Sequence, residues 1–148
     1  MERGAIAEYR ETDTFAALFP SPAPLMNKPL LGLLAGAGLG AIDGLTALVS
    51  APNVAPQITG IVIGSIGKGL VAGVLIGWFA KKVRNLPMGI VFGLAMGALF
   101  AFPIAMMNTD PVTGKSLFWE ILIPGSLVGV VVGFLTQRYG AASAPTAR

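Results

Sequence analysis

The sequence predicts an all-α integral membrane protein with four transmembrane helices packed by glycine stripes. The helices form two tandem helical-hairpin repeats in parallel orientation. Composition is the first observation behind this class: the 148-residue chain is 54% hydrophobic and only 11% charged, against roughly a quarter charged in ordinary soluble domains. Pattern is the second, because the apolar residues gather in four runs of about 20, which is the length that a helix needs to cross a hydrocarbon core of about 30 Å.

The four apolar runs cover residues 29–50, 58–80, 86–107 and 117–136. Short connectors with proline or glycine nearby separate them, so consecutive helices should be antiparallel neighbours. The predicted divisions are an N-terminal segment over residues 1–28, a transmembrane domain over residues 29–138 and a disordered tail over residues 139–148. Within the N-terminal segment, residues 5–19 form either a short interfacial helix or part of a flexible tail.

Basic residues predict the orientation of the chain. Lys81, Lys82 and Arg84 occupy the connector between the second and third helices, whereas the other two connectors together hold only Lys115. Because cytoplasmic loops carry an excess of lysine and arginine, we expect a protein of the plasma (inner) membrane with both termini in the cytoplasm.

Glycines recur at every fourth position along each predicted helix. An interior glycine costs a helix in water up to about 1 kcal/mol relative to alanine, but in lipid small residues let helices approach closely. The glycines expected at helix contacts are Gly32, Gly36, Gly40, Gly69, Gly73, Gly77, Gly89, Gly93, Gly97, Gly125, Gly129 and Gly133. These stripes predict a bundle in which the helices meet along their glycine faces.

The glycine pattern also repeats along the chain. Gly32 and Gly89 are 57 residues apart and Gly69 and Gly125 are 56 apart, with similar residues around each pair. The pattern favours a duplicated hairpin, with one repeat over residues 29–82 and the other over residues 86–138. Because each repeat holds an even number of spans, both have the same orientation, related by an axis along the membrane normal. Chance alignment of common glycine stripes is the alternative.

Three charged residues fall inside the predicted spans, where a charge at a helix centre costs about 2.5 to 3.5 kcal/mol. At 100° per residue, Asp43 lies on the glycine face of its helix, and Lys68 has a comparable depth in the next helix. We expect an ion pair between them, which either fixes the register of the two helices or forms a site; the structural role is favoured. Glu120 lies in the first turn of its span and about 180° from Gly129, which predicts an interfacial side chain that snorkels to water.

Two prolines predict kinks in the helices, and two missing residue types limit the reactions that the protein can catalyse. Pro103 and Pro124 each remove a backbone hydrogen bond inside a predicted helix, so both helices should be kinked there. The chain contains no histidine, the commonest metal ligand and general base, and no cysteine, which excludes thiolate metal sites and a cysteine nucleophile. We therefore expect no metal, no cofactor and no enzymatic activity.

Residues 64–69 resemble a phosphate-binding loop but lack its first glycine and its Ser or Thr.

A duplicated, glycine-rich chain of four helices with an acidic residue resembles the proteolipid class of rotary ATPases over most of its length. That resemblance implies a carboxylate in mid-membrane on the last helix, whereas Glu120 lies near the end of its span. No specific motif supports the match, and the sequence assigns no family.

The leading functional prediction is a non-enzymatic packing or accessory subunit of a membrane assembly. Its partners would be the lipid bilayer and other membrane subunits or further copies of the chain, and not nucleic acid, because the basic residues flank helices. The alternative is a small ion or solute transporter or channel. In that case Asp43 and Lys68 line the pathway, and Pro103 and Pro124 allow gating.

Overall fold

The computed structural model describes residues 26–141, and in this range it contains four long helices. They are α2 (Lys28–Ser50), α3 (Ile58–Lys82), α4 (Leu86–Met107) and α5 (Phe118–Tyr139). The 3-10 helix η1 (Pro52–Gln57) joins α2 to α3, and two short strands, β1 (Met26–Asn27) and β2 (Gly140–Ala141), pair in parallel. Each of the four long helices is long and apolar enough to cross a membrane.

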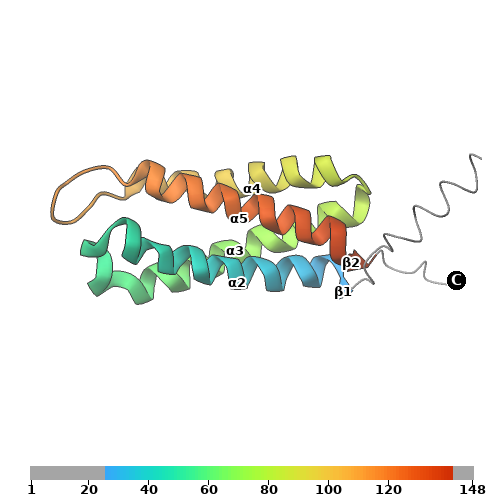
Figure 1. Cartoon of the computed structure of the whole chain (residues 1–148), viewed down its shortest axis with the longest axis horizontal. Coiled ribbons are helices and arrows are strands. Elements are labelled where there is room, and N and C mark those ends of the chain that lie inside the picture. The colour runs from blue at the N-terminus through green and yellow to red at the C-terminus, as the bar shows by residue number, and fades with distance from the viewer. Residues whose placement is uncertain (1–25, 142–148) are drawn as a thin grey trace, which may run out of the picture.

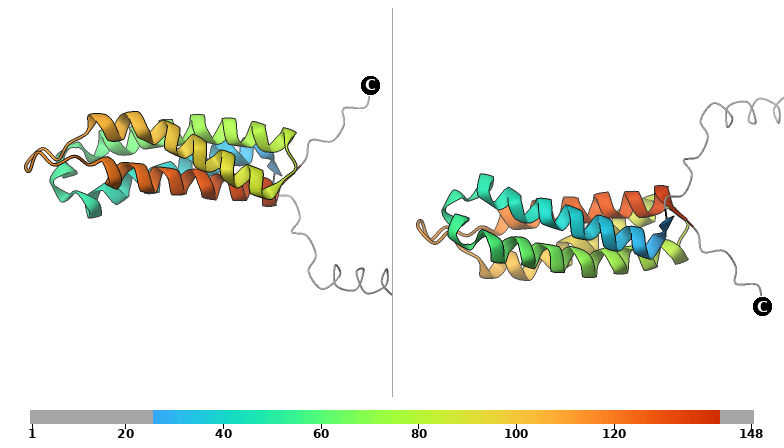
Figure 2. Two further views of the ribbon diagram at one scale, coloured as in Figure 1. Left: turned by 90° about the horizontal axis from the view of Figure 1, so that it is seen from above. Right: turned by 90° about the horizontal axis from the view of Figure 1, so that it is seen from below.

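The helices form two antiparallel hairpins that lie one over the other, α2 with α3 and α4 with α5 (Figure 1). We call the end that carries η1 and residues 108–117 the loop end. The opposite end, called the terminal end, carries β1, β2 and the connector of residues 83–85. All four helices run the length of the bundle between these two ends (Figure 2).

The two hairpins begin with the same local device. The side chain of Asn27 accepts a hydrogen bond from the Leu30 amide at 3.0 Å, and that of Asn85 accepts one from the Met88 amide at 3.2 Å. Each asparagine is followed two residues later by a proline in the first turn of the helix. An asparagine cap satisfies one of the free amides at a helix start, and proline is tolerated there because its missing N–H has no partner in the helix.

Within each hairpin the backbones of the two helices are in contact at glycines. A methyl group added at Gly36 would fall on the carbonyl oxygen of Gly69, and one added at Gly69 would fall on that of Gly36. Gly93 on α4 and Gly129 on α5 are related in the same reciprocal way in the second hairpin. The other glycines expected at helix contacts also have neighbouring atoms within reach of an added methyl group: Gly32, Gly40, Gly73, Gly77, Gly89, Gly97, Gly125 and Gly133.

The helix contacts of the second hairpin are shifted by one helical turn relative to those that the sequence alignment of the two hairpins would predict. In the first hairpin Gly32 meets Gly73. The sequence alignment makes Gly89 and Gly129 their counterparts, but Gly129 meets Gly93 instead. The α4–α5 contact is therefore displaced by four residues along α4.

The apolar core lies between the hairpins, nearer the terminal end. Ile76 on α3 and Val132 on α5 are fully buried there, with Ala72 and aromatic residues of α4 packed against them. Thr136 is also fully buried, and its hydroxyl donates a hydrogen bond to the Val132 carbonyl at 2.8 Å. The large apolar side chains on the outside of the bundle are exposed, as they would be where helices face lipid.

Some details differ from the sequence predictions. The tail predicted to be disordered from residue 139 is ordered in its first three residues, because Tyr139 ends α5 and Gly140–Ala141 pair with β1. This pairing adds a two-stranded sheet to a bundle that was expected to be all helix. Pro103 and Pro124 lie inside uninterrupted helices, so the predicted kinks stay a prediction. The N-terminal segment before residue 26, with the helix expected over residues 5–19, lies outside the described residues.

Candidate functional site

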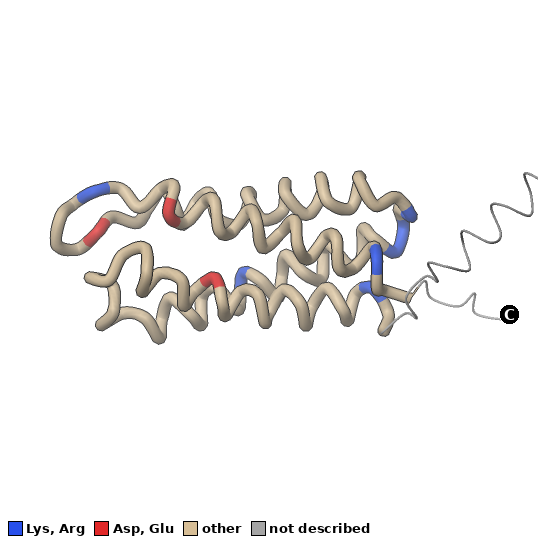
Figure 3. Tube along the Cα trace, viewed as in Figure 1, with Lys and Arg blue, Asp and Glu red and all other residues tan. Residues whose placement is uncertain are grey.

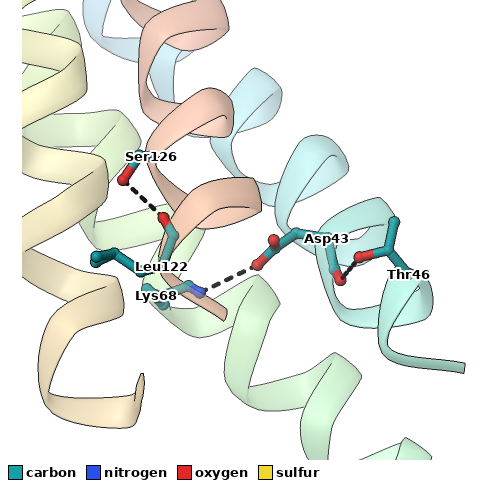
Figure 4. Close-up of polar contacts among 5 residues, drawn as sticks. All are labelled: Asp43, Thr46, Lys68, Leu122 and Ser126. Atoms are coloured by element: carbon teal, nitrogen blue, oxygen red, sulfur yellow. Dashed lines mark hydrogen bonds and ion pairs between the residues drawn. The ribbon is translucent and has the colours of Figure 1, made fainter. Parts of the chain in front are cut away.

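The structure brings Asp43 and Lys68 together between α2 and α3. Lys68 Nζ lies 3.0 Å from Asp43 Oδ2, and the side chains of Lys68 and Asp43 are 12% and 7% exposed. Figure 4 shows the lysine reaching from α3 toward the carboxylate on α2. Asp43 points inward because it comes seven residues after Gly36, which is almost two full turns and returns it to the glycine face.

Lys68 also approaches the second hairpin. A methyl group added at Gly125 on α5 would lie 3.6 Å from Lys68 Nζ. The missing side chain at this glycine therefore leaves room for the ammonium group between the two hairpins. The ion pair consequently lies close to the centre of the bundle rather than inside one hairpin.

A cavity of about 380 Å³ opens at the loop end between the hairpins and reaches the ion pair. Its volume lies in the range of small-molecule sites. The polar side chains that line it are Asp43, Thr46, Ser50, Gln57, Ser65, Lys68, Asn108, Thr109 and Glu120. Apolar residues of η1 and of all four long helices complete the wall. We call this space the loop-end cavity.

The structure gives Glu120 a neighbourhood that the sequence prediction did not include. Glu120 is exposed in the first turn of α5, as expected, but it lines the loop-end cavity together with Asp43 and Lys68. The glycine face of α5 contacts α4, so the opposite side, at the start of the helix, borders the space toward the first hairpin.

Two further glycines help to make the loop-end cavity. Gly60 and Gly64 on α3 line it, and a methyl group added at either would meet nothing within 4 Å. Neither glycine is among the α3 residues nearest to a methyl group added at the α2 glycines. Their missing side chains widen the cavity instead of bringing helices together.

On the other side of the ion pair the bundle closes. A second cavity of only about 20 Å³ is lined by the pair and by the glycine contacts of both hairpins. The buried side chains of Ile76 and Val132 border this small space, and they fill the bundle toward the terminal end. The ion pair thus stands between an accessible space and a packed apolar core.

A network that the sequence did not predict closes the terminal end. Lys28 is only 6% exposed, and its Nζ donates hydrogen bonds to the Ala80 carbonyl at 2.9 Å and to Gln137 Oε1 at 3.0 Å. Gln137 Nε2 in turn donates to the Val83 carbonyl at 2.6 Å. We call these four residues the terminal latch. Ala80 is in the last turn of α3, where carbonyls lack helical partners and cations are favoured, so Lys28 caps this helix.

Asp110 links the two hairpins at the loop end. Its carboxylate accepts hydrogen bonds from the Thr113 amide at 2.7 Å, the Val112 amide at 2.9 Å and the Asn53 side chain of η1 at 3.2 Å. The backbone amides of Thr113 and Val112, and then the Asn53 amide, lower the pKa of Asp110 to about 2, because all three bind the charged form. No sequence pattern indicated this link, since Asn53 and Asp110 lie in different connectors.

Charges are distributed unevenly between the two ends of the bundle. Figure 3 shows basic positions grouped at the terminal end and all acidic positions of the described chain in the other half. The basic residues at the terminal end are Lys28, Lys81, Lys82, Arg84 and Arg138.

Within residues 26–141, no three His, Cys, Asp or Glu residues are grouped so that they could hold a metal ion. Comparison of the chain with models of known families, with curated proteins and with solved structures finds no match.

Proposed function

We propose that the protein is a small transporter or channel that admits a solute or ion through the loop-end cavity to the Asp43–Lys68 pair. The observation that carries this proposal is the cavity itself, which leads from the loop end to a charged pair in the middle of the bundle. Intramembrane charges that border a cavity commonly mark a substrate or ion pathway.

The surroundings of the ion pair favour this function over a purely structural one. A pair that only fixed helix register would need no space beside it, and burial in packed protein would serve that role. Here the pair borders a cavity that is also lined by hydroxyl and amide groups. The apolar core and the terminal latch would close the pathway on the far side.

The charge distribution supports an orientation for this pathway. Five basic residues gather at the terminal end, and an excess of Lys and Arg favours the cytoplasmic side. The loop-end cavity would then face outward in the plasma (inner) membrane, with both termini in the cytoplasm.

We also infer that glycine stripes pack the bundle and that the hairpins arose by duplication. The reciprocal contacts of Gly36 with Gly69 and of Gly93 with Gly129 support the first inference. The shared cap, with Asn27 and Asn85 at the two helix starts, supports the second. The one-turn offset between the hairpins would then have arisen after the duplication.

A packing or accessory subunit is the second candidate, and one observation favours it. Gly38 and Gly67 are exposed, and a methyl group added at either would meet nothing within 4 Å. Another helix can approach closely at such positions, so a further membrane subunit or a second copy of the chain could pack there.

Single cysteines test the proposed pathway, because the chain contains none of its own. A cysteine replacing Thr46, which lines the loop-end cavity, should react with a small impermeant methanethiosulfonate reagent added from outside. A cysteine replacing Ala72, which lies beyond the ion pair in the packed core, should not react. Vesicles containing the wild-type protein should also show solute or ion flux above protein-free vesicles.

The same experiments separate the two candidate functions. An unreactive Thr46→Cys would remove the accessible cavity, and with it the pathway. Reactive cavity positions without any flux, together with a larger membrane complex that co-purifies in fixed proportion, would favour the accessory subunit.

A further inference from the structure

We infer that the loop-end cavity takes a small organic cation with an apolar body, bound between the carboxylates of Glu120 and Asp43. This inference rests on the proposed function and specifies the chemical class of its solute. It follows from the charge of the cavity lining, the unused oxygen of Asp43 and the apolar walls.

The lining of the cavity carries an excess of negative charge. Its charged side chains are two carboxylates, Asp43 and Glu120, and one ammonium group, Lys68. Lys68 is paired with Asp43 at 3.0 Å, and Glu120 makes no ion pair within residues 26–141. The carboxylate of Glu120 is therefore left to attract a cation.

Asp43 has a second carboxylate oxygen to offer. Only Oδ2 contacts Lys68, and the structure gives Oδ1 no hydrogen-bond donor. No buried side-chain oxygen in the described chain lacks a partner, so Oδ1 must reach accessible space. Asp43 lines both cavities. A cationic group in the larger one can approach the Asp43 carboxylate without separating the Asp43–Lys68 pair, whereas an anion would be repelled by the two carboxylates of the lining.

The apolar part of the lining fits the body of an organic molecule. Ile61, Ile104 and Ile121 line the cavity from α3, α4 and α5, with Val54 of η1 at the loop end. Such a lining lowers the free energy of an apolar group that leaves water. A hard inorganic cation prefers six or more oxygen ligands and gains nothing from isoleucine walls. The combination of two carboxylates and apolar walls thus points to an organic cation.

Gly64 determines how much room such a molecule has. It lines the cavity, and no atom lies within 4 Å of a methyl group placed there. A larger side chain at this position would project into the cavity without touching the helix contacts. Gly64→Leu is therefore a variant that should fill the site and leave the fold intact.

Equilibrium dialysis with labelled benzyltrimethylammonium tests the inference on the full-length protein in a neutral detergent. The wild type should bind this cation saturably, while phenylacetate and the uncharged isostere neopentylbenzene should not compete. Glu120→Gln should weaken binding about tenfold or more, because one Coulombic partner of the cation is lost, and Glu120→Asp should retain part of the affinity. Gly64→Leu should abolish binding at an unchanged unfolding temperature.

Lys115→Gln is the control, because it changes the charge of the loop end by one unit, in the opposite direction, outside the cavity lining. Its affinity should equal that of the wild type. Equal affinity of the wild type and Glu120→Gln would overturn the inference. Saturable binding of phenylacetate in place of the cation would also overturn it, and would leave the cavity as a solute site. If no probe binds, the inference fails, and the labelling of Thr46→Cys and the flux measurement decide separately whether the pathway exists.

Discussion

Each charged side chain inside the helices has a partner or borders an accessible space. Asp43 and Lys68 neutralise each other, and Glu120 stands at the start of α5, where the helix dipole favours a carboxylate. Its position at the helix start stabilises α5, while its position on the cavity allows it to interact with a solute. The two roles differ in what they require, since only the second depends on access from the loop end.

The ion pair gives a prediction on stability. Asp43→Asn should lower the free energy of unfolding by about 3 kcal/mol, the lower end of the cost of breaking a buried pair, because the cavity admits some water to the unpaired lysine. Adding Lys68→Met should recover much of this loss. Thermal or denaturant unfolding in detergent measures both effects, and a fully stable Asp43→Asn protein would contradict a structural contribution from the pair.

The Asp110 link gives a prediction on pH. Because the pKa of Asp110 is lowered from 3.8 to about 2, its hydrogen bonds stabilise the fold above pH 3.8 and are lost as the pH falls through 2. Hydrogen exchange at the amides of Val112 and Thr113 should therefore accelerate between pH 4 and pH 2, beyond the intrinsic trend. Asp110→Asn should show fast exchange at these amides throughout, and an unchanged pH profile in that variant would refute the link.

At the scale of the helix, local sequence was sufficient to locate the four long helices. The predicted and observed helix limits differ by three residues at most, because hydropathy and proline act within a few residues. The partners of Lys28 and Asp110 were not predictable in this way. Lys28 meets Gln137 across 109 positions of the chain, and Asn53 meets Asp110 across 57. Such contacts depend on how the hairpins stack, which no local pattern encodes.

The glycine contacts give a prediction for matched substitutions. Gly73→Ala should destabilise the bundle, because the added methyl group falls on the Gly32 carbonyl oxygen and forces α2 and α3 apart. Gly38→Ala, where the methyl group meets nothing within 4 Å, should leave stability unchanged or raise it by up to about 1 kcal/mol through helix propensity. Unfolding temperatures in detergent provide the comparison, and equal losses in both variants would mean that the contact itself does not matter.

At the scale of the whole molecule, the uneven distribution of charge is the feature that was most accessible from sequence. The basic connector at residues 81–84 lies at the terminal end, as its place between the second and third helices requires. The loop-end cavity was less accessible, because it depends on residues from η1 and all four helices together. The spacing of Glu120 gave its angle on α5 but could not say which neighbour that side would face.

Orientation is directly testable with single cysteines in whole cells. Cysteines replacing Asn53 and Lys115 should react with an impermeant maleimide from outside, while one replacing Lys82 should react only after permeabilisation. Residues 53 and 115 share the loop end, so both should behave alike. Labelling at position 82 in sealed cells would reverse the orientation.

The pairing of β1 with β2 has a consequence for the order in which the helices can follow one another along the chain. Met26 lies beside Gly140 and Asn27 beside Ala141, so the two ends of the bundle domain are neighbours. Chains with adjacent ends tolerate circular permutation well. A permuted chain could begin at Asn85, run through α4 and α5, cross a short Gly/Ser linker from Ala141 to Met26, and finish at Arg84. Asn85 would still cap α4 and Gln137 would still meet Val83. If this chain inserts and gives the wild-type pattern of cysteine labelling, either hairpin can be synthesised first. The contacts between helix faces are then sufficient to assemble the bundle.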